Sequence, residues 1–193
     1  MKLAIFVILK QFSDWEGAYL ASQLNQSSQW QVKYASNQTS VTSIGGLTVL
    51  PDYQLDQLPQ EIDLLVLIGG NAWQLTDQQF VTKLQQRLQN KLPVAAICGA
   101  VDFLAKNGLL NQYQHTGNSQ SLWADYPDYQ NQTGYQLHQA VRDRNLVTAN
   151  GTAALDFTEQ VLMMIDFSAQ IRQQVDFYRL GFYQYCKKYG NPF

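Results

Sequence analysis

Four short apolar runs, separated by amphipathic stretches, set the pattern of the chain. They cover residues 3–9, 63–70, 93–98 and 145–151, and turn-forming residues follow them. Continuous apolar runs of this length are typical of parallel strands that are buried on both faces. Residues 31–36 alternate more between apolar and polar positions, which predicts a strand nearer to a sheet edge.

Between these runs, apolar residues recur at spacings of three and four, the period of a helix with one buried face. This spacing predicts helices over residues 15–26, 77–89, 100–107 and 154–167. Thr76 and Gln79 match a capping box at the start of the second helix. Gly108 is placed to end the third.

Strands that alternate with helices predict an α/β fold, in which helices cover both faces of a parallel sheet. Residues 41–53 break the alternation and predict a small β-hairpin insertion. We expect residues 1–166 to form this domain and residues 167–193 to add a helical extension packed on it. In that extension, apolar residues at positions 171, 175, 178 and 182 make a helical stripe, which is more typical of packing than of a cofactor site.

Composition excludes several classes of protein. The 193 residues carry a net charge of −2, which does not favour nucleic acid as a partner because phosphate binding needs clustered Lys and Arg. No window approaches the roughly 18 apolar residues of a membrane span, and the first apolar run predicts a strand, not a secretion leader. The two cysteines make no disulfide framework, so we expect a reduced cytoplasmic setting.

Cys98 lies where the apolar run 93–98 ends and a helical pattern begins. In a nucleophile elbow, small residues two positions before and after the nucleophile allow a sharp strand-to-helix turn. Ala96 and Ala100 occupy those positions here, and Gly99 follows the cysteine directly. The turn would place the thiol at the carboxyl end of a strand and at a helix N-terminus, which favours a thiolate. A core cysteine at a tight corner explains the same local pattern, so both interpretations stay open.

Two further stretches lie at predicted strand ends. Ser13 and Glu16 match a capping box, yet Glu16 also follows the first strand and would lie near Cys98. Gly69 and Gly70 follow the second apolar run. Glycines at that place are often turn formers, but they also allow a backbone N–H to approach a substrate oxygen, as an oxyanion hole requires.

These three elements, together with HTGN (115–118) and TANGTAALDF (148–157), resemble the DJ-1/PfpI superfamily across nearly all of residues 1–166. The resemblance implies a flavodoxin-like fold related to class I glutamine amidotransferases. It also implies a nucleophilic Cys98 in contact with the Glu16 carboxyl, with the N–H groups of Gly70 and Gly99 at the oxyanion position. His115 matches the family's histidine and takes a catalytic role, whereas His138 is expected to be structural.

Two positions depart from relatives with known chemistry. Protease-like members of the superfamily have a histidine directly after the cysteine, where this chain has Gly99. Class I amidotransferases end with a His-x-Glu pair that this chain lacks. Neither peptide cleavage nor ammonia transfer from glutamine is therefore favoured by the motifs alone.

The leading hypothesis is a cysteine-dependent hydrolase that acts on small amides, peptides or carbonyl compounds, in which His115 moves the proton. A redox or stress-response protein, a glyoxalase- or deglycase-like enzyme and a catalytically silent binding protein are the alternatives. The sequence has no metal-ligand cluster, phosphate loop or dinucleotide fingerprint, so we expect neither a metal nor a cofactor. From the resemblance we expect a homodimer, with no nucleic-acid or membrane partner.

Overall fold

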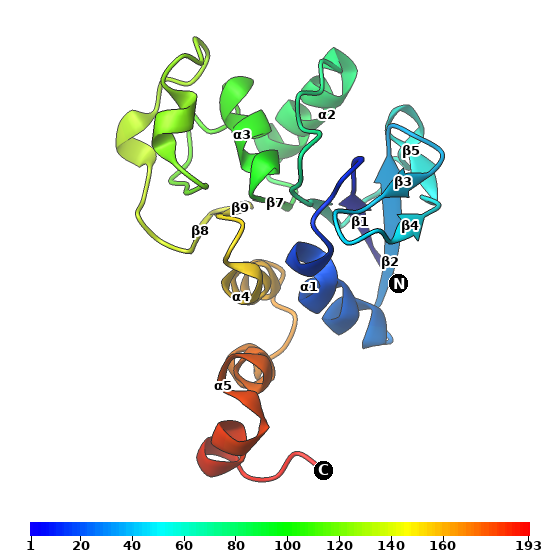
Figure 1. Ribbon diagram of the computed structural model, residues 1–193, viewed down its shortest axis with the longest axis vertical. Coiled ribbons are helices and arrows are strands. Elements are labelled where there is room, and N and C mark those ends of the chain that lie inside the picture. The colour runs from blue at the N-terminus through cyan, green and yellow to red at the C-terminus, as the bar shows by residue number, and fades with distance from the viewer.

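A seven-stranded, mainly parallel sheet forms the centre of the computed structural model, which describes residues 1–193 (Figure 1). The strands run in the order β5-β2-β1-β6-β7-β9-β8, and only β8 is antiparallel to its neighbour. Their bounds are β1 (Lys2–Val7), β2 (Trp30–Ser36), β5 (Tyr53–Gln54), β6 (Leu64–Leu67), β7 (Val94–Ile97), β8 (Ala140–Asp143) and β9 (Leu146–Ala149). The predicted α/β fold with a parallel sheet is confirmed.

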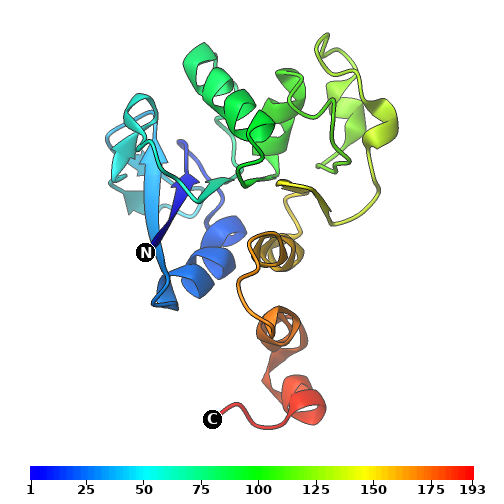
Figure 2. The ribbon, with the colours of Figure 1, turned by 180° about the vertical axis from the view of Figure 1, so that it is seen from behind.

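Helices cover both faces of this sheet, α2 and α3 on one side and α1 and α4 on the other (Figures 1 and 2). Alternate residues of each strand supply the two apolar layers: Ile5 and Val7 face one layer, Ala4 and Phe6 the other. The helices are α1 (Asp14–Gln26), α2 (Gln78–Gln89), α3 (Gly99–Lys106), α4 (Ala154–Met164) and α5 (Ile171–Tyr189). None of them is both long enough and apolar enough to span a bilayer.

The predicted hairpin insertion is present as β3 (Val41–Thr42) paired with β4 (Thr48–Val49). Two strands were not expected from the sequence. β5 is a two-residue strand at the edge of the sheet next to β2, and β8 follows a loop that begins after α3. Both are short and only partly buried, so they leave no continuous apolar run.

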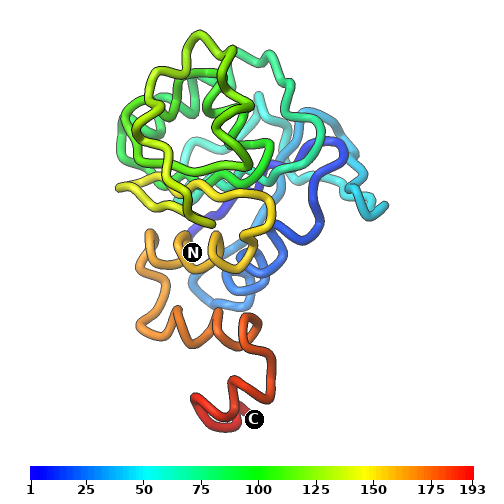
Figure 3. Tube along the Cα trace, turned by 60° about the vertical axis from the view of Figure 1, so that its left-hand side comes forward, coloured from blue at the N-terminus to red at the C-terminus, as the bar shows by residue number.

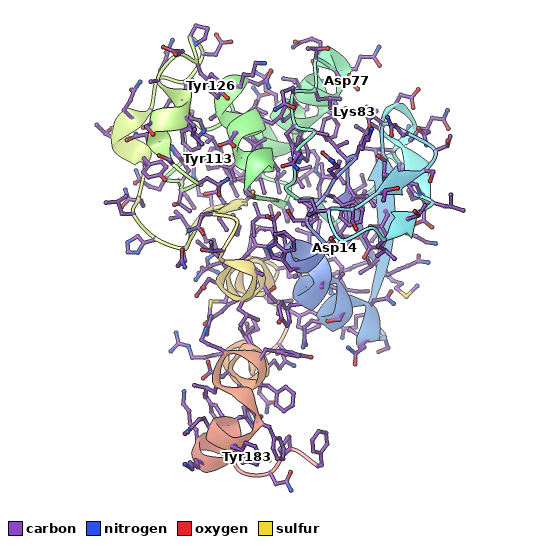
Figure 4. The ribbon with its side chains drawn as sticks, in the orientation of Figure 1. Asp14, Asp77, Lys83, Tyr113, Tyr126 and Tyr183 are labelled. Carbon is purple, nitrogen blue, oxygen red and sulfur yellow. The ribbon has the colours of Figure 1, made fainter.

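Helix α2 begins one residue later than the capping-box pair predicts. Asp77 is its N-cap, and the Asp77 carboxylate accepts a hydrogen bond from the Phe80 N–H at 3.0 Å. The cap that Thr76 and Gln79 predict is therefore wrong, because Asp77 is the N-cap and its side chain caps the Phe80 N–H, three residues on. Figure 4 labels Asp77 at this helix start. Gly108, in contrast, has a φ of +67° directly after the Asn107 cap of α3, as expected for a helix end.

Helix α5 extends away from the sheet beyond α4 and carries the C-terminus outward (Figures 1 and 3). Ile171 and Val175, from the predicted stripe, are buried against the layer that contains α4. Gly181 breaks the helix with a φ of 70° and a ψ of 162°, and residues 182–189 turn back so that Tyr185 packs on Phe177. Tyr183, labelled in Figure 4, is 80% exposed on the outer side of this unit. The homodimer and the division of the chain at residue 166 stay predictions.

The Asp77 cap gives a direct test of the α2 start. Replacing Asp77 with Ala should lower the free energy of unfolding by about 1 kcal/mol, because the Phe80 N–H loses its acceptor. The exposed Thr76 makes no such bond, so Thr76→Ala should change stability by less than about 0.5 kcal/mol. Urea denaturation of the two variants and the parent protein measures both effects. An equal loss in both variants would contradict the assignment of the cap.

Candidate functional site

Cys98 occupies the junction between β7 and α3 with a φ of 58° and a ψ of −129°. A cysteine rarely adopts a positive φ, and this conformation is a strained one that the surrounding structure must hold. The Cys98 N–H donates to the Ala149 carbonyl at 3.0 Å, and the Cys98 carbonyl accepts from the Val101 N–H at 2.9 Å. These bonds fix the turn from both sides and place the thiol at the carboxyl ends of the parallel strands, where such sheets bind ligands.

Glu16 approaches Cys98 from α1, on the far side of β6. Strand β6 lies between β1 and β7 in the sheet, so the carboxyl must reach across the end of β6. It does so at Gly69, whose N–H donates to Glu16 Oε2 at 2.8 Å. A Cβ atom at position 69 would lie 2.5 Å from both Cys98 Cβ and Glu16 Oε2, closer than real contacts allow. The lack of a side chain at Gly69 therefore permits the contact between Glu16 and Cys98.

The Glu16 side chain is fully buried, and it does not act in a capping box. Ser13 is the N-cap of α1, but its side chain makes no capping hydrogen bond, and its N–H donates to Gly69. The capping-box explanation of Glu16 is therefore wrong. Oxygen Oε1 of Glu16 has no hydrogen-bond partner within 3.5 Å among the protein's polar atoms, although it is enclosed. Oε1 and the Cys98 sulfur border the same small space, since a Cβ at Gly151 would lie 2.9 Å from Sγ and 3.2 Å from Oε1.

Asn118 supplies a polar hydrogen to the sulfur. Its Nδ2 donates to Cys98 Sγ at 3.3 Å, while its Oδ1 accepts from the Gly151 N–H at 2.9 Å. The second bond fixes the orientation of the amide, so the NH₂ group must face the thiol. Asn118 and Gly151 lie in the HTGN and TANG segments, but nothing in the sequence shows that their amides meet Cys98.

Burial dominates the ionisation of this pair. It raises the pKa of the Glu16 carboxyl, against the opposing effect of the nearby Cys98 thiol, Ser13 hydroxyl and Gly69 N–H. It also raises the pKa of the Cys98 thiol, and the negative charge of Glu16 raises it further, while Asn118 and the Gly99 N–H lower it. Two adjacent negative charges disfavour each other, so the pair loses its two protons in separate steps, and between these steps one proton remains on the pair.

The predicted oxyanion donors flank the thiol. The Gly99 N–H lies against the Cys98 sulfur, and the Gly70 N–H makes no hydrogen bond within the chain. Both glycines line a cavity of about 320 Å³ that also includes Cys98 and Asn118. Backbone N–H groups beside a thiol are a feature of sites that stabilise an oxyanion.

His115 lies elsewhere, in a buried cluster of aromatic rings. Its Nδ1 pairs with the Tyr113 carbonyl at 2.8 Å and its Nε2 with the Tyr129 hydroxyl at 2.9 Å. Burial lowers the pKa of His115, so the ring is neutral at pH 7, with Nδ1–H as donor and Nε2 as acceptor. Both nitrogens are occupied and His115 does not line the cavity of Cys98. Its position therefore does not support the proton-transfer role predicted from the sequence.

His138 is exposed just before β8, and its carbonyl accepts a hydrogen bond from the Thr116 hydroxyl. Elsewhere in the chain, no three His, Cys, Asp or Glu side chains gather in an arrangement that would hold a metal ion. The cavity offers the Cys98 thiol and the backbone of Gly70 and Gly99, and the buried Glu16 carboxyl lies behind the thiol, outside the cavity lining.

The placement of His115 predicts that its loss affects stability and leaves the thiol unchanged. His115→Gln should lower the free energy of unfolding by about 1–3 kcal/mol, because buried partners lose their hydrogen bonds. The rate of Cys98 alkylation by iodoacetamide, followed from pH 6 to pH 10 by mass spectrometry, should retain its midpoint. A shifted midpoint would show that His115 is coupled to the thiol after all.

Known proteins resemble this chain over its whole length. It is 50% identical over 195 residues to the Bacillus subtilis (strain 168) protein named "Uncharacterized protease YdeA", which covers 100% of this chain and 99% of that protein. It is 37% identical over 177 residues to "Uncharacterized protease YoaZ" of the same organism, over 84% of this chain and 82% of that one.

Solved structures agree with these relatives. The DJ-1 superfamily protein Atu0886 from Agrobacterium tumefaciens superposes with a TM-score of 0.85 at 31% identity, covering 93% of this chain and 98% of that one. A thiJ/pfpI family protein from Bacillus anthracis gives 0.81 at 31% identity, over 98% of both chains. The family model described as "DJ-1/PfpI family" matches residues 1–164, which contain the strand-to-helix turn at Cys98, Glu16 and Asn118. The chain therefore belongs to the DJ-1/PfpI family.

Proposed function

We propose that this protein is a cysteine-dependent enzyme that acts on small carbonyl compounds, with Cys98 as nucleophile and Glu16 as proton carrier. The observation that carries the proposal is the buried Glu16 Oε1, which has no partner and lies beside the sulfur at a strained elbow. A carboxyl group is costly to bury in this way, and a role in proton transfer explains why it is placed there.

The first step follows from the shared proton. As Sγ adds to the carbonyl carbon, the proton of the thiol passes to the Glu16 carboxylate, and the C=O π electrons move onto oxygen. The N–H groups of Gly70 and Gly99 stabilise that oxyanion. Glu16 then returns its proton to the oxygen, which gives a hemithioacetal from an aldehyde. This sequence needs one proton carrier at the sulfur, and Glu16 alone supplies it.

Hydrolysis of a small amide or peptide is the second candidate. The two Bacillus subtilis relatives are named proteases, and the same thiol and oxyanion donors would form a thioester. That route also requires the leaving amine to be protonated, for which Glu16 would have to serve because His115 is engaged elsewhere. A cavity of about 320 Å³ lies at the small end of ligand pockets, which favours a small substrate over a long peptide.

A screen of glyoxals, small aldehydes, small amides and short peptides tests the reaction class. We expect turnover of at least one aldehyde or glyoxal, and we expect Cys98→Ala to abolish it, because the nucleophile is lost. Cys186→Ala is the matched control and should retain full activity, since Cys186 lies on α5, away from the cavity. Turnover restricted to amides or peptides would favour hydrolysis.

No turnover of any compound would contradict the proposal. In that case, intact mass after mild peroxide would test the redox role. A gain of two oxygen atoms at Cys98, absent from Cys98→Ser, would support a sulfinate held by Glu16.

The shared proton predicts opposite effects of Glu16→Gln on two rates. The amide removes a negative charge that raises the pKa of Cys98, and it can donate to sulfur, so the midpoint of Cys98 alkylation should move to lower pH. Alkylation at pH 7 should therefore be faster by about several-fold, because a larger share of the thiol is ionised. Turnover should fall, because the amide cannot accept the proton.

The control for this prediction is Glu61→Gln, which removes an exposed carboxylate outside the cavity. It should leave both rates unchanged. If Glu16→Gln and the parent protein share one alkylation midpoint and one turnover rate, Glu16 carries no proton in the reaction.

A further inference from the structure

A second carboxylate lines the cavity of Cys98. Asp102 lies in the first turn of α3, and Cys98 is the residue directly before that helix. Both border the cavity of about 320 Å³, together with Lys106, which lies one turn further along the same helix. The proposed reaction uses neither Asp102 nor Lys106.

The Asp102 carboxylate is held in place but has no cation. Its Oδ1 accepts a hydrogen bond from the indole Nε1–H of Trp123 at 2.7 Å, and Trp123 is itself buried. No Lys, Arg or His forms an ion pair with Asp102. Oxygen Oδ2 accepts no hydrogen bond from the protein, and it is not sealed off as Glu16 Oε1 is. It is therefore open to a ligand.

Burial removes water from the Asp102 carboxylate, which disfavours its charged form and raises the pKa of Asp102. The aromatic cluster keeps it in position: Trp123 packs on the rings of His115, Tyr129 and Tyr135. A charge that is oriented, partly desolvated and unpaired is complementary to a cationic ligand.

The rest of the cavity wall carries one other charge. Lys106 is exposed and forms no ion pair, and it does not reach Asp102 within 4.0 Å. The other polar side chains are the neutral amides of Asn71, Gln74 and Asn118 and the hydroxyl of Tyr126. Tyr126, labelled in Figure 4, belongs to the loop beside α3. The cavity thus presents a carboxylate on its wall and an ammonium group on an exposed side chain one helical turn away.

We propose that the substrate of Cys98 carries an ammonium group, which Asp102 binds through Oδ2 while the thiol attacks the neighbouring carbonyl. Where the ligand also has a carboxylate, Lys106 binds it. The substrate class is therefore a small amino compound with a reactive carbonyl group, of amino-acid size. The reaction itself rests on the proposed function, but the preference for a cation is a property of the cavity and is measurable without turnover.

Methanethiosulfonate reagents of different charge test this preference at Cys98. The Cys98 thiolate attacks the sulfenyl sulfur, a disulfide forms and methanesulfinate leaves, so no other reactant is needed. The reagents are the methyl compound, the trimethylammonium-ethyl compound and the sulfonato-ethyl compound. Each rate at Cys98, resolved from Cys186 by peptide mass spectrometry, is divided by the rate of N-acetylcysteine amide, a thiol without a carboxylate, which removes intrinsic reactivity.

We expect the cationic reagent to exceed the neutral one by about tenfold after this correction, as attraction to a single charge near a protein surface gives. Asp102→Asn should reduce the ratio to about one, because the charge is lost while an oxygen remains for the Trp123 N–H. Asp56→Asn removes an exposed carboxylate outside the cavity and should keep the ratio. Lys106→Gln should slow only the anionic reagent, and urea denaturation checks that each variant is folded.

A corrected ratio near one in the parent protein, or an unchanged ratio in Asp102→Asn, would overturn this inference and leave the proposed function standing. Failure of Cys98 to react with any of the three reagents would count against both. Reaction with the neutral reagent shows that the Cys98 thiol is reactive. A reactive thiol that shows no preference for the cationic reagent therefore contradicts only this inference.

Discussion

The site depends on the contact between the Glu16 carboxyl and the Cys98 thiol. The two groups meet at the end of β6, a strand that carries neither of them. Glu16 comes from the helix after β1 and Cys98 from the end of β7, with β6 between them. Their contact exists because Gly69 has no side chain to fill the space. Burial raises the pKa values of both groups, and the charge of Glu16 raises that of Cys98 further, so the two ionisations are coupled.

The other polar groups of the site come from α3, from the loop after it and from the turn after β9. Asn118 fixes the sulfur from the loop after α3, and its own orientation is set by the N–H of Gly151 after β9. The same loop carries Trp123, which orients Asp102 from a cluster of aromatic rings. His115 lies in this cluster, with its two nitrogens paired with the Tyr113 carbonyl and the Tyr129 hydroxyl, and it is one of the rings that hold the loop.

Local signals in the sequence predicted the sheet and the place of Cys98 well. A buried parallel strand is a continuous apolar run, and a sharp turn needs small residues, so both are visible within a few positions of Ile97 and Gly99. Contacts between residues distant in sequence were not predictable in this way. The pairing of His115 with Tyr129, the position of β6 between Glu16 and Cys98, and the unpaired state of Asp102 are set by packing, which no local pattern records. The cap of α2 was misplaced for a simpler reason, since Thr76 and Asp77 are adjacent and both suit the role.

The segments that form the site are far apart in the sequence, and this separation affects when the site forms during folding. Five segments widely spaced along the chain, around residues 16, 69, 98, 118 and 151, must all be in place before the thiol meets its carboxyl partner. Contacts of such long sequence separation form late in folding, because the entropy of closing the intervening loops must be overcome first. A chain still emerging from the ribosome lacks the segment around Gly151 until most of its length has been synthesised. The nascent protein therefore carries an ordinary cysteine, and the environment described here arises only when folding is complete.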